Sequence, residues 1–238
     1  MTRRAVCIIP ARGGSKRFPR KNLARFEGVP LLVRPIHTAQ ATGLFDRIIV
    51  STEDPEIAQV ATDAGAEVHA RPPELATDSA RVAEVCVDVL LCACADGSMT
   101  ARDVFCVLIP PSPFRTPEHV TDSYVLLDAR PERPGRPRPN GVMSVSEFPH
   151  MPAWAVHEWD EHVRLFWGKR WLQSRDALPV LYRHNGVVLW MRVGAFLRAT
   201  DFYGPRIVPY YMTPEESVDI DTPLDLEFAE FLAGRTPT

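Results

Sequence analysis

The sequence predicts an α/β fold in which helices flank a mostly parallel central sheet. Short β-branched runs bounded by turn residues alternate with longer segments of helical period. Several of the helical segments open with proline, which helices accept in their first turn. With 238 residues, 45% hydrophobic and 24% charged, the chain can bury the core of one domain without disulfide bonds.

Seven runs are predicted to be strands because each is short, apolar and bounded by turn signals. In chain order they are Ala5–Pro10, Arg47–Ser51, Glu67–Ala70, Phe105–Ile109, Gly141–Val145, Val187–Met191 and Ile207–Tyr210. Five segments are predicted to be helices from their periodicity and start signals, namely Pro30–Thr42, Pro55–Ala64, Ala80–Ala95, Pro117–Asp128 and Pro223–Leu232. We expect residues 1–238 to form a single domain.

Two segments interrupt this alternation. Residues 130–140 are rich in proline and are predicted to form a loop, a candidate lid. Residues 148–182 place tryptophan and phenylalanine among charged residues and do not read as part of the main sheet. We expect this excursion to pack against another surface, such as a second subunit, rather than to hold a cofactor.

Composition narrows the class of partner. A net charge of -3 lacks the basic excess that binding to nucleic-acid phosphates requires. No apolar run reaches 18 residues, and the first apolar stretch is too short for a signal peptide, so we expect neither a membrane span nor secretion. Five cysteines without a C-x-x-C pair predict reduced thiols and a cytoplasmic location.

The end of the first strand carries the clearest functional signal. An apolar strand delivers the chain to a turn with Gly13 and Gly14, at the edge where open α/β sheets bind ligands. Glycines let backbone amides approach phosphate oxygens, and nearby cations add positive charge, namely Arg12, Lys16, Arg17, Arg20 and Lys21. The loop matches neither a Walker A motif nor a G-x-G-x-x-G fingerprint, but it predicts an anion-binding cradle.

Four ordered motifs resemble the CMP-sialic acid synthetase family of cytidylyltransferases, which also includes phosphonate cytidylyltransferases. They are residues 9–22 (IPARGGSKRFPRKN), 48–54 (IIVSTED), 71–78 (RPPELATD) and 217–223 (SVDIDTP). The resemblance covers nearly the whole chain. It implies a three-layer, Rossmann-like nucleotidyltransferase fold, CTP as substrate and a homodimer in which residues 148–182 reach across to the partner's acceptor site.

The resemblance also assigns roles. Nucleotide-binding positions are Ala11, Arg12, Gly13, Gly14, Ser15, Lys21, Asn22, Arg71 and Asp78, with Arg12, Lys21 and Asp221 as the catalytic set. Asp219 and Asp221 match the carboxylates of a Mg²⁺ site. Two aspartates at i and i+2 on an extended segment point the same way and offer the hard oxygens that Mg²⁺ prefers. The expected reaction is in-line attack of an acceptor oxygen on the α-phosphorus of CTP, which releases pyrophosphate.

The acceptor stays open between two classes. Residues 107–116 (VLIPPSPFRT) resemble the family's L-L-Q-P-T-S-P-L-R-T segment, yet Ile109 replaces its sugar-contacting glutamine, and a lysine often found near residue 150 is missing. Arg115, Arg175, Arg183 and Asn185 match positions that face the acceptor. A nonulosonic or other 3-deoxy-2-keto sugar acid is the family's usual acceptor. The altered positions also suit a small anion such as phosphonoformate.

A third reading is a non-catalytic relative that only binds nucleotide. The complete set of Arg12, Lys21, Asp219 and Asp221 argues against it.

Overall fold

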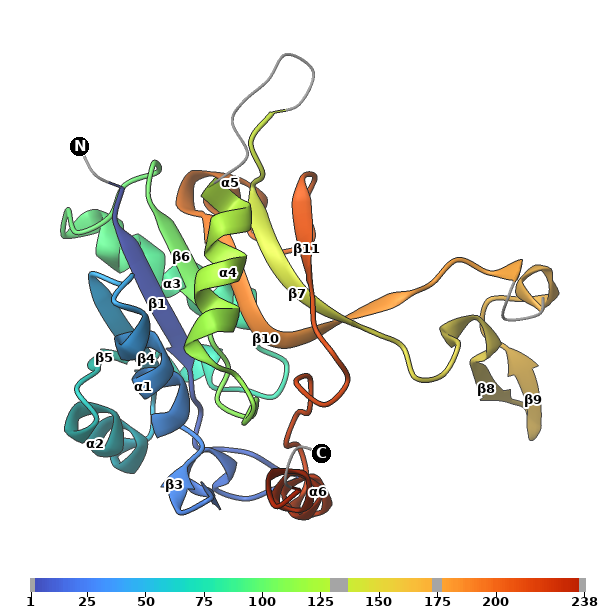
Figure 1. Ribbon diagram of the computed structural model, residues 1–238. Coiled ribbons are helices and arrows are strands. Elements are labelled where there is room, and N and C mark those ends of the chain that lie inside the picture. Colours follow the sequence, from blue (N-terminus) through green and yellow to red (C-terminus); the bar gives the residue numbers. More distant parts are fainter. Residues whose placement is uncertain (1–2, 129–136, 173–176, 236–238) are drawn as a thin grey trace.

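The computed structural model describes residues 3–128, 137–172 and 177–235. Its body is a three-layer α/β sandwich, and a small two-stranded arm projects from one side (Figure 1). The predicted fold class is therefore confirmed. Most of the proline-rich 130–140 segment, proposed as a lid, falls outside the described residues.

One sheet of seven strands forms the middle layer, in the order β11-β7-β10-β6-β1-β4-β5. Its strands are β1 (Ala5–Pro10), β4 (Arg47–Thr52), β5 (Glu67–Ala70), β6 (Val104–Val107), β7 (Gly141–Glu147), β10 (Tyr182–Arg192) and β11 (Ile207–Tyr211). Only β10 is reversed, since it pairs antiparallel with both β6 and β7, whereas the other pairings are parallel. All seven strands lie where the sequence predicts them, with shifts at their ends.

Helices cover both faces of this sheet. Side chains of β1 alternate between the two faces: Cys7 and Ile9 join the core beneath α1 (Val33–Thr42), α2 (Pro55–Asp63) and α4 (Pro117–Asp128). Val6 and Ile8 join the opposite core, beneath α3 (Val82–Ala95) and α5 (Val193–Ala199). The sequence analysis missed α5, a helix of only seven residues.

Near the carboxyl end of β1, a short two-stranded ribbon and the last helix pack together. Strand β2 (Arg25–Phe26), which pairs with β3 (Val29–Pro30), contacts α6 (Pro223–Ala233), and a small core of Phe26, Leu31, Ile220 and Ala229 fills this region. This packing brings α6 back to the opening loop, residues 11–22, which follows β1.

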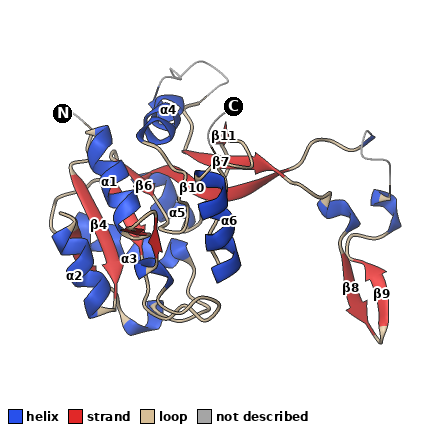
Figure 2. Cartoon of the chain, turned by 60° about the horizontal axis from the view of Figure 1, so that its bottom comes forward, coloured by secondary structure: helices blue, strands red, loops and turns tan. Residues whose placement is uncertain are grey.

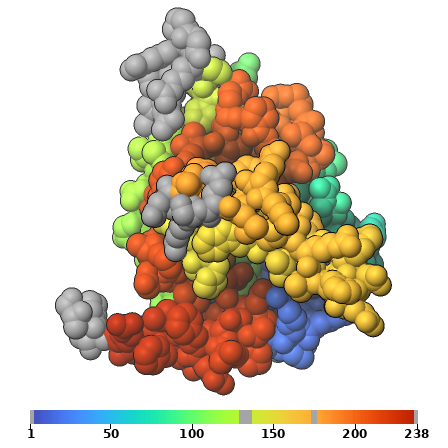
Figure 3. Space-filling model, turned by 90° about the vertical axis from the view of Figure 1, so that its right-hand side faces the viewer, coloured from blue at the N-terminus to red at the C-terminus, as the bar shows by residue number. Residues whose placement is uncertain are grey.

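The described part of the 148–182 excursion, residues 148–172 and 177–181, forms the projecting arm, and Tyr182 already belongs to β10. Its hairpin consists of β8 (Val156–Trp159) and β9 (His162–Leu165), which pair only with each other, so the prediction that it lies outside the main sheet is confirmed. Figures 1 and 2 show the hairpin standing clear of the body, and Figure 3 shows the arm from its own side. Among the described residues, no helix is long and apolar enough to cross a membrane.

Candidate active site

Two adjoining pockets lie at the carboxyl ends of β1 and β6. The first, of about 520 Å³, is bounded by Pro10 after β1 and by Pro110 and Pro111 after β6. The second, of about 380 Å³, shares Val82, Ile109 and Asp219 with it. In the sheet the chain leaves β1 toward β4 and later returns to β6 on the other side of β1. The pockets therefore occupy the switch point where α/β sheets bind ligands.

The opening loop is held by its own backbone and by the strand beside it. Ala11 N donates to Ser51 O at 3.0 Å, and Asn22 Nδ2 donates to Arg12 O at 2.9 Å. Gly13 passes so close to Asp54 that an added Cβ would lie 2.5 Å from Asp54 Oδ2. A Cβ on Gly14 would meet nothing within 4 Å. The two glycines thus serve different needs, since only Gly13 is required by the fold.

The cations of the loop are all paired with carboxylates: four pair with two aspartates, Asp78 and Asp221, and Arg20 pairs with Glu56 and Asp54. Asp78 accepts from Arg12 at 2.8 Å and Lys16 at 2.6 Å. Asp221 accepts from Lys21 at 2.8 Å and from Arg17 at 2.7 Å. Hydrogen bonds from Lys16 and then Arg12 lower the pKa of the Asp78 carboxyl. Each of these two aspartates therefore holds two cations at the pocket.

Residues 217–223, just before and at the start of α6, present Asp219 and Asp221 to the same pocket, as the i, i+2 spacing predicts. Between them Ile220 is buried in the small core, and its N–H donates to Pro111 O at 2.9 Å. The capping carboxylate Asp225 accepts from the Asp221 N–H at 3.0 Å and from the Thr222 N–H at 2.7 Å. The start of α6 thereby fixes the backbone that carries both carboxylates.

The two aspartates differ in environment. Burial, followed by the charge of Asp221, raises the pKa of Asp219 to about 6, and its buried Oδ1 has no hydrogen-bond partner. Burial alone would raise the pKa of Asp221 too, but the hydrogen bond and charge of Lys21 lower it. An unpartnered buried carboxylate oxygen beside a second carboxylate fits a hard cation such as Mg²⁺.

Asn22 and Arg71, two of the predicted nucleotide-binding residues, line the first pocket as buried polar residues. Arg71 donates through Nη2 to Ser51 O at 2.6 Å, and burial lowers its pKa. Ser51 O thus accepts from both Arg71 and the Ala11 N–H. This shared carbonyl ties Arg71 to the start of the loop after β1.

The second pocket has an apolar wall and a polar rim. Val107, Ile109, Leu189 and Phe202 form the wall. Ile109 packs against Gly186, where an added Cβ would lie 2.5 Å from Ile109 Cδ1. Gly186 also has a φ of +75°, a conformation that favours glycine. Arg183 reaches this pocket and donates to Ser217 O at 3.2 Å.

Three other predicted acceptor residues fare differently. Asn185 lines the second pocket, but its amide is already bonded to Ser144, Ser217 and the Val187 N–H. Arg115 lines neither pocket; it is buried and donates to the carbonyls of Val187 and Ile109 at 2.6 Å. These contacts hold the loop after β6 against β10. Arg115 therefore supports the wall of the second pocket but does not itself line it. Arg175 lies outside the described residues.

Sequence reasoning missed His184, which lies between Arg183 and Asn185 in the chain. His184 lines the second pocket, its buried Nε2 has no hydrogen-bond partner, and burial lowers its pKa. Tyr203, also missed, lies with its hydroxyl 3.4 Å from His184 Nδ1. Neither residue lies in a motif that predicts function. His184 on β10 and Tyr203 after α5 come together only when these segments pack against each other.

Comparison with known proteins agrees with this geometry. Residues 6–95 match the profile of the family described as Cytidylyltransferase. The CMP-N,N'-diacetyllegionaminic acid synthase of Legionella pneumophila is 30% identical over 237 residues, with 96% of each chain covered. The pseudaminic acid cytidylyltransferase of Campylobacter jejuni is 29% identical, with 95% of each covered.

Other similarities concern part of a longer chain or the fold alone. The N-acylneuraminate cytidylyltransferase of Escherichia coli is 29% identical, and the alignment covers 96% of this chain but 52% of that one, so the chain spans about half its length. Among solved structures, CMP:2-keto-3-deoxy-manno-octonic acid synthetase complexed with CTP has a TM-score of 0.65 at 18% identity, covering 97% of this chain and 98% of that one. The fold, the loop motif and the near full-length match together show that the chain belongs to the acylneuraminate cytidylyltransferase family.

Proposed function

We propose that this protein is a cytidylyltransferase that transfers CMP from CTP to a nonulosonic acid and releases pyrophosphate. The observation that carries the proposal is the pair of adjoining pockets that share Asp219, one ringed by cations and the other reached by Arg183. A nucleotide in the first pocket and an acid in the second meet at this carboxylate. Relatives named for sialic, legionaminic and pseudaminic acids support the acceptor class.

In the proposed reaction the triphosphate replaces the aspartates as partner of the loop cations. Arg12 and Lys16 leave Asp78, and Lys21 and Arg17 leave Asp221, for phosphate oxygens. The freed cations then stabilise the negative charge that develops as the acceptor oxygen attacks the α-phosphorus. Asn22 and Arg71 hold the base end of the nucleotide, and exclusion of UTP or ATP rests on them.

We assign a magnesium site to Asp219 and Asp221. When bound there, Mg²⁺ supplies charge neutralisation and orientation of the phosphates. Arg183 holds the acceptor carboxylate, and His184 offers a neutral ring nitrogen to an acceptor hydroxyl.

A second candidate acceptor is a small phosphonate. The apolar wall of Val107, Ile109, Leu189 and Phe202 favours it, because a polyol packed there leaves hydroxyl groups without partners, at a cost of about 1–3 kcal/mol each. Arg183 suits a phosphonate as well as a carboxylate.

The test is pyrophosphate release from CTP with magnesium, measured against a panel of nonulosonic acids, 3-deoxy-2-keto acids and small phosphonates. The proposal expects turnover with a nonulosonic acid and little with UTP or ATP. Turnover with phosphonates alone would transfer the assignment to the second candidate. CTP binding without release for any acceptor would mean a non-catalytic relative.

Replacing Asp219 with asparagine tests the metal assignment. The variant keeps the size of the side chain but removes a charge, so the magnesium concentration for half-maximal rate should rise at least tenfold and kcat should fall. Asp63→Asn, on the surface of α2, serves as the control and should match wild type. Wild-type magnesium dependence in Asp219→Asn, or near wild-type release in Asp221→Ala, would remove these residues from the metal site.

We further propose a cytoplasmic homodimer joined through the 148–182 arm. The hairpin of the arm stands clear of the body (Figure 2), and the arm exposes Trp154, Trp159, Phe166 and Trp167, which is costly for a monomer in water. The five cysteines are all unpaired, as a reducing compartment favours.

A further inference from the structure

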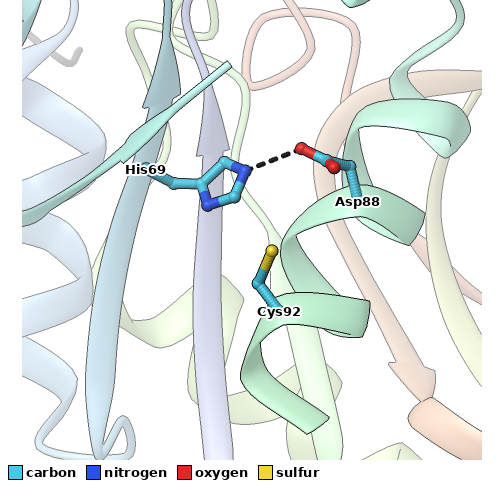
Figure 4. A group of neighbouring side chains, drawn as sticks. All are labelled: His69, Asp88 and Cys92. Atoms are coloured by element: carbon cyan, nitrogen blue, oxygen red, sulfur yellow. Dashed lines mark hydrogen bonds and ion pairs between the residues drawn. The ribbon is translucent and has the colours of Figure 1, made fainter. Parts of the chain in front are cut away.

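Away from both pockets, an imidazole, a carboxylate and a thiol lie together between the edge strand of the sheet and helix α3. His69 lies on the edge strand β5, and Asp88 and Cys92 lie one turn apart on α3. One potential ligand atom from each residue lies within 4.8 Å of the other two. Figure 4 shows the His69 ring facing α3, with Asp88 and Cys92 facing the ring from successive turns of the helix.

The atoms already approach the spacing of a coordination shell. His69 Nε2 lies 2.7 Å from Asp88 Oδ2. In a tetrahedral zinc site with metal–ligand distances of about 2.0–2.3 Å, neighbouring ligand atoms lie about 3.3–3.8 Å apart. The histidine–aspartate pair needs to open slightly and the thiol to move inward by about 1 Å, which side-chain rotation supplies.

The donor set selects the class of metal. Magnesium and calcium prefer all-oxygen ligands, whereas imidazole with thiolate suits zinc and neighbouring transition metals. Cys92 is also the one exposed cysteine of the five, and His69 and Asp88 are half-buried, so an ion can enter from solvent. Three protein ligands leave the fourth position to water.

We propose that His69, Asp88 and Cys92 form a transition-metal site of the zinc class that ties the edge strand β5 to α3. Binding releases the thiol proton of Cys92, and the neutral His69 ring keeps its one proton on the nitrogen away from the metal. The site is separate from the magnesium site and does not depend on the proposed transferase activity. It also stands close to the nucleotide pocket, because His69 pairs with Ser51, whose carbonyl accepts from Arg71.

Cobalt binding provides a direct test. Chelator-treated full-length protein, free of nucleotide and magnesium, is titrated with Co²⁺ and followed by the thiolate-to-cobalt charge-transfer band in the near ultraviolet. We expect one Co²⁺ per chain, displaced by Zn²⁺, and a higher melting temperature with Zn²⁺. Zn²⁺ should also slow modification of Cys92 by a thiol reagent.

Matched variants identify the ligands. Cys92→Ser should lose the band, whereas Cys94→Ser, two residues along the same helix and outside the cluster, should keep it. His69→Gln and Asp88→Asn should each weaken Zn²⁺ binding by more than about tenfold. Circular dichroism confirms that each variant is folded. The proposal would be overturned if wild type showed no charge-transfer band, or if the band survived in Cys92→Ser. Unchanged Zn²⁺ affinity in His69→Gln would also overturn it.

Discussion

Gly13 and Gly14 are adjacent in the opening loop, yet the structure gives them different roles. The sequence predicts the same role for both, namely to let backbone amides approach phosphate oxygens. Only packing shows that Gly13 must lack a side chain because Asp54, the N-cap of α2, occupies the adjoining space. Gly14 faces open space, so its role rests on the ligand.

We predict that alanine separates these roles. Gly13→Ala displaces Asp54, which caps Glu56 N and Ile57 N, and should lower the free energy of unfolding by about 1–2 kcal/mol. Gly14→Ala should leave stability within about 0.5 kcal/mol while weakening CTP binding. Urea denaturation and calorimetric CTP titration measure the two effects. Equal destabilisation by both substitutions would contradict this division.

Ile109 lies at the boundary of the two pockets and is where the sequence departs from its family pattern. We predict that Ile109→Gln restores an amide to the acceptor wall and raises kcat/KM for hydroxyl-rich sugar acids by about tenfold or more relative to phosphonates. Val82→Gln places the same amide at another shared position and is the control. A ratio that Ile109→Gln does not change would show that this residue does not select the acceptor.

At the scale of elements, the strands were predicted well because a buried strand carries its signal locally. Runs such as the one forming β1 read as strands whatever surrounds them. The reversal of β10 was not predicted, since direction depends on which neighbours a strand pairs with. The position of the arm was predicted only as an interruption of the pattern.

The arm itself makes a testable prediction. Trp159 and Val163 are exposed by 57% and 75% on the hairpin, so replacing both with serine costs the monomer little packing. We expect the double variant to shift the protein from dimer toward monomer in sedimentation velocity. Val125→Ser, at a position 55% exposed on α4, should leave the dimer intact. A wild-type protein that is monomeric at micromolar concentration would contradict the dimer.

Across the whole molecule, the cysteines report on the core. Burial raises the pKa of the thiols of Cys7, Cys86 and Cys106, which lie on both faces of the sheet. The folded protein therefore keeps these thiols protonated above pH 9.0, the ordinary value for cysteine, while the unfolded chain ionises them.

The predicted consequence is a loss of stability at alkaline pH. Because the unfolded state binds fewer protons, the free energy of unfolding should fall between pH 9 and 10, by up to about 1.4 kcal/mol per pH unit for each thiol. Urea denaturation across this range measures the slope. Cys86→Ala should reduce the part of this slope that the three thiols contribute by about a third. This holds whether or not the substitution itself changes the free energy of unfolding. An unchanged slope would mean that the thiols ionise within the fold.

The sequence by itself determined the α/β class, the seven strands, the basic glycine-containing loop after β1 and the carboxylate pair, because periodicity and loop composition are local properties of the chain. Tertiary structure alone decided that Arg115 supports the loop after β6, that Asn185 is bonded within the protein and that His184 lines the second pocket. Arg115 bonds Val187, 72 residues away in the chain, and Asn185 bonds Ser144 and Ser217, 41 and 32 residues away. Burial and pairing between such distant segments exist only after the sheet has assembled.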